Sequence, residues 1–180
     1  DFQCGLSNAQ LDELYREFDG CVNPPAPPAD GAVCVPERVA ALPRETVFAC
    51  EPGTFALPVA NERGATVLGI GLVDSGDYAP TGGYGAPSPR ALRFLRQVPA
   101  QLGQGVRSMV FQHTALPQYY RLLKPVASTA AHAVEGYRMF SGQYYVLDER
   151  ATEPGGYLGE GVSSPDDDSG EFPILTGTGA

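Results

Sequence analysis

The spacing of apolar residues along the chain predicts one early helix followed by a series of strands. Ser7 and Gln10 form a capping-box sequence, in which each side chain accepts a hydrogen bond from the other residue's backbone amide. Four apolar residues follow at the i, i+3, i+4, i+7 spacing of a helical stripe: Leu11, Leu14, Tyr15 and Phe18. We therefore expect a helix over residues 7–18, with Gly20 ending it.

Residues 46–73 carry the apolar pattern of β-strands. Segments 46–50 and 54–59 flank the turn Glu51-Pro52-Gly53, which predicts a hairpin. The run 65–73 is apolar at nearly every position. This is typical of a central strand that is covered on both faces of its sheet.

A helix and a further strand are expected next. Ser88 caps the helix, Pro89 occupies its first position, and Pro99 should kink it or end it early. Four residues should face inward: Leu92, Leu95, Val98 and Leu102. The run 106–111, centred on Met109, Val110 and Phe111, predicts a buried strand that ends near His113. Strand, helix and strand in this order predict a βαβ-like unit, and therefore an α/β fold with parallel pairing.

After His113 the pattern weakens. Residues 119–124 predict a short helix that Pro125 ends. We expect a single domain over residues 1–180, in which the proline-rich residues 22–44 form a loop insertion. The acidic residues 166–171 fail the EF-hand pattern and predict a solvated turn.

The composition excludes some classes of partner. The 180 residues carry a net charge of -9, which argues against nucleic-acid binding because a phosphate backbone requires a basic surface. It does not argue against a small phosphate ester whose charge is met by metal ions. No apolar run approaches the roughly 20 residues of a membrane-spanning helix, so we expect no membrane span.

The four cysteines all lie in the first fifty residues: Cys4, Cys21, Cys34 and Cys50. They form no CxxC motif, which excludes a zinc ribbon or a thioredoxin-like site. An even number in a proline-rich region fits two disulfides, with three possible pairings, and hence a secreted protein or another oxidising compartment. Four reduced, partly buried thiols are an equally good interpretation.

Polar residues follow the two strands that are expected to be parallel. Asp74 and Asp77 come directly after one strand, and His113 follows the other. Ligand sites in α/β sheets lie beyond the carboxyl ends of strands, where carboxylates and an imidazole can bind a metal or serve as acid and base. Tyr78 and Tyr84 are candidates, with Asp74 and Asp77, for lining the mouth of such a pocket. Turn chemistry for the aspartates and a structural role for the histidine remain alternatives.

Three segments together resemble the calcineurin-like metallophosphoesterases, in the branch similar to plant and fungal purple-acid-phosphatase-like proteins. Residues 72–88 are similar to that branch's "DSGDY … GYG … PS" segment. Residues 111–120 are similar to its "FxHxPLPEY" segment, and residues 160–172 to its "EG(I/V)SS … SGxF" segment. The order of these three segments and the spacing between them agree with those of the family over nearly the whole chain.

The resemblance implies a four-layer αββα sandwich with two mixed sheets, and a phosphate ester hydrolysed by hydroxide held on two metal ions, Fe, Mn or Zn. His113 matches the lone histidine that is a metal ligand in the family, and Asp1 the last residue of the GNHD motif. The other metal motifs, DxH, GDxxD and GHDH, have no match.

We therefore expect this chain to be the part of a phosphoesterase between GNHD and GHDH. Alone it should bind no metal and be inactive, and its exposed sheet edges could drive self-association. The parent's substrate would be a small phosphate ester or a phosphoprotein. A non-catalytic binding or structural module on the same scaffold is the alternative.

Overall fold

The computed structural model describes residues 4–179, which form two compact units. Unit 1 comprises residues 4–75, 87–113 and 173–179, and unit 2 comprises residues 76–86 and 114–172. Each unit is described by itself. The prediction of one domain over residues 1–180 stays a prediction.

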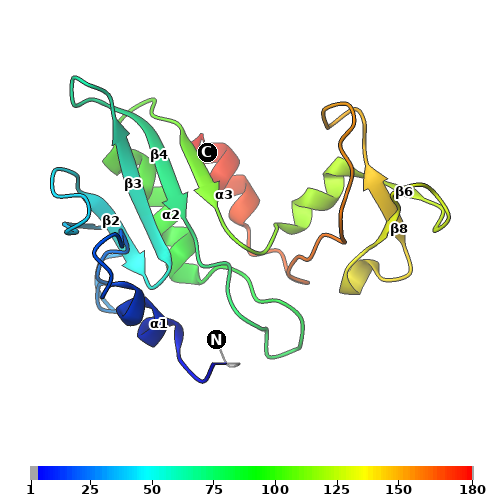
Figure 1. Ribbon diagram of the computed structural model, residues 1–180, viewed down its shortest axis with the longest axis horizontal. Helices are drawn as coiled ribbons and strands as arrows, with labels where there is room; N and C mark the ends of the chain where they lie inside the picture. The colour runs from blue at the N-terminus through cyan, green and yellow to red at the C-terminus, as the bar shows by residue number, and fades with distance from the viewer. Residues whose placement is uncertain (1–3, 180) are drawn as a thin grey trace. The chain divides into compact units, whose positions relative to one another are not determined.

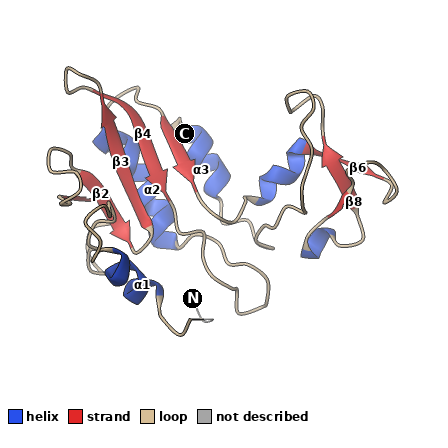
Figure 2. Cartoon of the chain, viewed as in Figure 1, coloured by secondary structure: helices blue, strands red, loops and turns tan. Residues whose placement is uncertain are grey.

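Unit 1 contains a mixed five-stranded sheet (Figures 1 and 2). The strands lie in sequence order: β1 (Val35–Glu37), β2 (Val47–Glu51), β3 (Thr54–Ala60), β4 (Thr66–Leu72) and β5 (Ser108–Phe111). Strands β1 to β4 pair antiparallel, and β4 pairs parallel with β5. The predicted hairpin, the internal position of β4 and the parallel βαβ unit are thus confirmed, and the chain is mixed α/β. The expected cover on both faces of β4 is not present, since Val67 is 53% exposed.

Three α-helices accompany these strands: α1 (Asn8–Tyr15), α2 (Pro89–Leu102) and α3 (Glu171–Thr178). The local start signals are confirmed, since the Ser7–Gln10 capping box is formed. Ser88 Oγ likewise accepts a hydrogen bond from the backbone of Ala91. Helix α2 runs through Pro99 to Leu102, so the proline does not end it early. Within residues 4–179, no helix is both long and apolar enough to cross a membrane.

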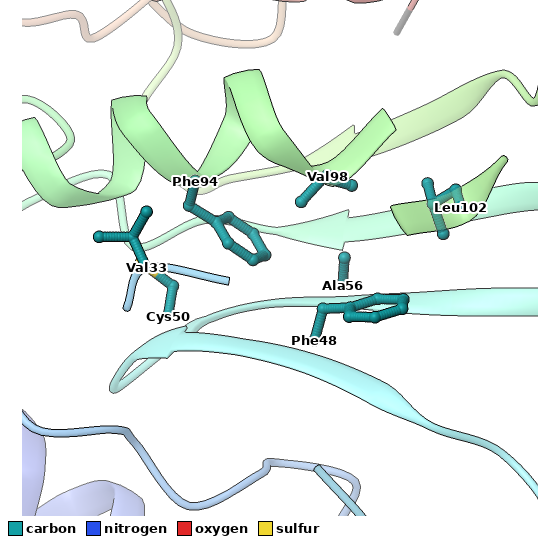
Figure 3. Packing of buried hydrophobic residues seen from close by; sticks show 7 residues of the cluster. All are labelled: Val33, Phe48, Cys50, Ala56, Phe94, Val98 and Leu102. Atoms are coloured by element: carbon teal, nitrogen blue, oxygen red, sulfur yellow. The ribbon is translucent and has the colours of Figure 1, made fainter. Parts of the chain in front are cut away.

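Helix α2 packs its apolar face on one side of the sheet (Figure 3). The largest cluster joins the segment before β1 to residues of β2, β3 and α2: Val33, Phe48, Cys50, Ala56, Phe94, Val98 and Leu102. A second cluster brings Ile174 of α3 against Leu95 and Val73. Gly69 of β4 permits this close approach, because a Cβ there would lie 2.3 Å from Leu102 Cδ1.

Two predictions about burial in unit 1 are wrong. Strand β5 is an edge strand of this sheet, and Met109 and Phe111 are about half exposed.

The α1 stripe is also largely exposed, and the helix ends at Tyr15 instead of residue 18. The residue of α1 that is buried is Asp12, which accepts hydrogen bonds from Arg16 Nε at 3.2 Å and Asn23 Nδ2 at 3.0 Å. Polar bonding therefore sets the inner face of this helix.

The predicted loop insertion at residues 22–44 contains the short strand β1 and is anchored to α2. The buried Arg90 donates hydrogen bonds to the carbonyl oxygens of Ala29, Gly31 and Ala32, and to that of Cys50 in β2. One guanidinium thus satisfies backbone acceptors that the prolines of this segment leave without a regular ladder partner.

Unit 2 contains a three-stranded antiparallel sheet in the order β6-β8-β7. Its strands are β6 (Leu123–Val126), β7 (Val134–Glu135) and β8 (Tyr144–Leu147), and two 3₁₀ helices accompany them, η1 (Pro117–Leu122) and η2 (Arg138–Phe140). The short helix expected over residues 119–124 is therefore a 3₁₀ helix that ends earlier. Pro125 lies within the edge strand β6, where a residue without an N–H is tolerated.

Tyr120 organises the core of unit 2. Its ring stacks on Phe140, with centroids 3.9 Å apart, and meets the buried Tyr145 edge-on. Its hydroxyl accepts a hydrogen bond from the backbone N–H of Tyr137 and donates one to the carbonyl oxygen of Val162. These bonds connect η1 to two loops that are distant in sequence.

Candidate functional site

The carboxyl edge of β4 and β5 places Asp74 and His113 at the same level. Leu72 pairs with Phe111 in the parallel register, and the backbone N–H of Val73 donates to the carbonyl oxygen of Phe111 at 3.0 Å. Asp74 and His113 each follow that pair by two residues. The sequence-based placement of these two residues at one edge of the sheet is therefore confirmed.

Asp74 is half-buried and held on two sides within unit 1. Its Oδ2 accepts a hydrogen bond from Asn8 Nδ2 at 3.0 Å, and its backbone N–H donates to Thr54 Oγ1 at 3.1 Å. Thr54 is fully buried. The carboxylate thus has a fixed position between the start of α1 and the start of β3, which favours a built site over a free turn.

A cavity of about 270 Å³ lies beside Asp74. Its lining comes from α1, from the segment after it and from the β2–β3 turn: Asn8, Leu11, Asp12, Tyr15, Asn23, Pro52, Gly53 and Asp74. The carboxylate of Asp12 is already bound by Arg16 and Asn23. The second carboxylate, Asp74, therefore gives the cavity its acidic character on the side of the strand ends.

His113 is exposed and follows β5 directly, with the half-buried Gln112 before it and the buried Thr114 after it. Its imidazole is thus accessible at the end of the strand, as a metal ligand or a proton carrier requires. His132, the other histidine, lies in unit 2 against the ring of Tyr157, with centroids 4.9 Å apart.

The remaining candidates belong to unit 2. Asp77, Tyr78 and Tyr84 lie in the loop of residues 76–86, where Tyr78 and Tyr84 form an isolated β-bridge. The rings of Tyr78 and Tyr84 stack at 5.8 Å, and Tyr84 stacks on Tyr137 at 5.2 Å. Tyr78 and Asp77 are exposed. A role for these residues at a pocket mouth stays a prediction, and Asp1 lies outside the described residues.

Two glycines explain the spacing of this loop. Gly76 has φ +86°, and a Cβ there would lie 2.7 Å from the carbonyl oxygen of Ala86. The backbone N–H of Gly85 donates a hydrogen bond to the carbonyl oxygen of Asp77. A Cβ on Gly85 would lie 2.8 Å from the same oxygen. The two ends of the loop approach so closely that larger residues do not fit.

Sequence reasoning missed an ionic contact in unit 2. Arg138, which has the unusual φ of +43°, pairs with Asp166 at 2.9 Å, and Gln118 Nε2 donates to Asp168. The acidic segment is therefore not simply a solvated turn. Arg138 lies 28 residues before Asp166 in the sequence, so no local sequence signal indicates this pair. A Cβ on Gly83 would lie 2.5 Å from Arg138 Nε, so the guanidinium packs directly on the loop backbone.

Of the two interpretations of the cysteines, the one with two disulfides is not borne out, since no disulfide is present among residues 4–179. Cys50 is fully buried, and burial raises the pKa of its thiol to about 12. Cys34 is half-buried, and burial raises the pKa of its thiol to about 11. Both are protonated at neutral pH, which disfavours a role as catalytic nucleophiles.

The edge of the sheet supplies less than a dinuclear metal centre requires. In the described part of the chain, no three His, Cys, Asp or Glu side chains gather closely enough to hold a metal ion. One imidazole and one carboxylate do not by themselves fit two metal ions, each of which needs several ligands. No protein-family model matches this chain, and neither the curated proteins nor the solved structures contain a significant match.

Proposed function

We propose that this chain is part of a metal-dependent phosphoesterase, to which it contributes one edge of the active site. The observation that carries the proposal is the equal level of Asp74 and His113 beyond the parallel strands β4 and β5. Ligands of α/β sheets bind at this edge. The resemblance of residues 72–88, 111–120 and 160–172 to metallophosphoesterase segments supports the same assignment.

The second face of the five-stranded sheet supports the four-layer sandwich. Gly69, Gly71 and Val110 lie on the side of α2. Because side chains alternate along a strand, the opposite face carries Ile70 and Leu72 of β4, with Met109 and Phe111 paired beside them. This apolar face, exposed at β5, is of the kind that packs on a second sheet. We propose that it does so in the complete protein.

In this proposal His113 provides one imidazole nitrogen to a metal ion, and the carboxylate of Asp74 orients polar groups beside it. Further ligands must come from motifs that the described residues do not contain. The chain alone is then inactive toward phosphate esters. A non-catalytic module with the same scaffold would share the fold but would have no such ligands in the complete protein.

The test is hydrolysis of p-nitrophenyl phosphate by the complete protein in the presence of Mn²⁺ or Zn²⁺. His113→Ala should lower turnover by about 100-fold and lower the bound metal with it, since removal of a ligand weakens the site. His132→Ala is the matched control and should retain activity within about twofold. Full activity of His113→Ala would exclude His113 as a ligand. A wild-type protein that hydrolyses no phosphate ester would favour the non-catalytic module.

A further inference from the structure

Two cysteines lie close together where β1 begins beside β2. Strands β1 and β2 pair antiparallel, with Val35 opposite Ala49 and Pro36 opposite Phe48. Cys34 is the bend residue immediately before β1, and the same register continued by one residue would set it against Cys50. Residues opposite each other in an antiparallel pair have Cα atoms about 4.5–5.5 Å apart, within the range of roughly 4.4–6.8 Å that a disulfide spans.

The side chains of these cysteines point to the same region. Cys50 belongs to the cluster beneath α2, where it lies beside Val33 (Figure 3), and Cys34 packs against that cluster. The charge of Cys34 is one of the smaller causes of the raised pKa of Cys50, after burial, as expected for two neighbouring thiols. Cβ atoms on one face of paired strands are the arrangement that a cross-strand disulfide needs.

The position of Cys50 is fixed by its neighbours. The pairing of β2 with β3 is irregular between Ala49 and Glu51, so Cys50 is the additional residue of a bulge. Its carbonyl oxygen accepts the hydrogen bond from Arg90 Nε at 2.9 Å. The backbone of Cys50 is therefore held in place from both β3 and α2.

The remaining cysteines are less suitable partners. Cys50 has no exposed surface, so only a residue that packs on its cluster can reach its sulfur. Cys21 Sγ instead accepts a hydrogen bond from the backbone N–H of Asn23 at 3.4 Å. Of the pairings that four cysteines allow, the geometry favours the one that joins Cys34 to Cys50.

We propose that Cys34 and Cys50 are a site of oxidative modification, which a low-molecular-weight disulfide such as oxidised glutathione converts to a cross-strand disulfide. The half-buried Cys34 reacts first: its thiolate attacks one glutathione sulfur, and glutathione thiolate leaves. Cys50 then attacks Cys34 Sγ as its thiolate, and the second glutathione leaves as a thiolate that takes up the proton given up by Cys50. Two protein thiols are oxidised, and one glutathione disulfide is reduced to two thiols.

The rate of this reaction should depend strongly on pH. Burial raises the pKa of both thiols, and for Cys50 the neighbouring Glu51 raises it further while Arg90 lowers it. Below these pKa values the thiolate fraction rises about tenfold per pH unit. Closure should therefore be slow at pH 7 and about a hundredfold faster at pH 9.

The experiment is peptide mapping after incubation of the protein with oxidised glutathione and alkylation of the remaining thiols. Trypsin leaves Cys21 and Cys34 in one peptide, and a second cleavage before Asp30 separates them. We expect one linked pair, between the peptides of Cys34 and Cys50, with Cys21 outside it. A bond from Cys34 to any other cysteine, or a persistent glutathione adduct on Cys34 in the wild type, would overturn the assignment.

Two variants separate the steps without requiring a stable disulfide. Cys50→Ser should trap glutathione on Cys34, because the second attack is lost. Cys21→Ser is the control and should close at the wild-type rate. The oxidised protein should have a higher Tm without a reductant than with one, since a cross-link restricts the unfolded chain. An unchanged Tm in a protein shown to be linked would contradict the close placement of Cys34 and Cys50 in the fold.

Discussion

Asp74 and His113 each stand two residues beyond the pair Leu72–Phe111, on two strands that run parallel. Helix α2 lies between these strands in the sequence, so the βαβ connection brings together residues 39 positions apart. The hydrogen bond from Asn8 adds the start of α1 to the same edge. The fold thus gathers polar groups from three segments at the place where α/β sheets bind ligands.

Gly69 should be intolerant of a side chain. A Cβ would lie 2.3 Å from Leu102 Cδ1 and 2.6 Å from Ser108 Oγ, where α2 meets the sheet. Gly69→Ala should lower the free energy of unfolding by about 1–3 kcal/mol, as overpacking of a core does. A Cβ on Gly20 would meet nothing within 4 Å, so Gly20→Ala should change the free energy of unfolding by less than about 0.5 kcal/mol. Urea unfolding measures the free energy of unfolding of both variants. If the two variants were equally stable, the close packing at Gly69 would be contradicted.

Arg90 should be needed to hold the proline-rich segment. Its guanidinium bonds to four backbone carbonyl oxygens of residues 29–32 and 50. Arg90→Ala should cost about 2–4 kcal/mol of stability, because buried acceptors lose a charged donor, and Arg90→Lys should restore only part of it. Limited proteolysis should cut residues 22–34 faster in both. The exposed Arg93 of the same helix is the control; if Arg93→Ala were equally damaging, the anchoring role would be wrong.

The Asp148–Arg150 pair should make part of the stability dependent on acid. The Arg150 guanidinium, bonded to Asp148 at 2.6 Å, lowers the pKa of that carboxyl to about 2. A carboxyl whose pKa is lower in the folded state stabilises the fold above its unfolded pKa of about 4. That stability is lost as the pH falls from about 4 to 2. NMR titration should show the pKa of Asp148 rising in Arg150→Ala and unchanged in Arg63→Ala, and no rise in the former would refute the pair.

The exposed apolar edge should cause self-association at high concentration. Met109 and Phe111 lie about half exposed on the edge strand β5, and such an edge offers unpaired backbone groups beside an apolar surface. Phe111→Glu should shift the chain toward the monomer in sedimentation velocity. Tyr157→Glu changes an even more exposed aromatic residue of unit 2 and serves as the control. A monomeric wild type at all concentrations would contradict this expectation.

The sequence could predict features that local chemistry decides. The Ser7–Gln10 and Ser88 caps depend on residues within one turn. The internal position of β4 in the sheet follows from its nearly continuous apolar sequence. Burial of β5 could not be predicted, because it depends on what covers the strand. Arg90 and Arg138 were missed for a related reason. Their partners lie 28 to 61 residues away, so nothing near either arginine identifies them.

The most direct test of the account is Mn²⁺ binding to the complete protein, followed by paramagnetic broadening of its NMR signals. Mn²⁺ added well below one equivalent should broaden the imidazole of His113 and the backbone signals of Asp74 before those of His132. In His113→Ala, the broadening at Asp74 should decrease strongly. Equal broadening at both histidines, or an unchanged effect at Asp74 in the variant, would contradict a metal-binding edge at the ends of β4 and β5.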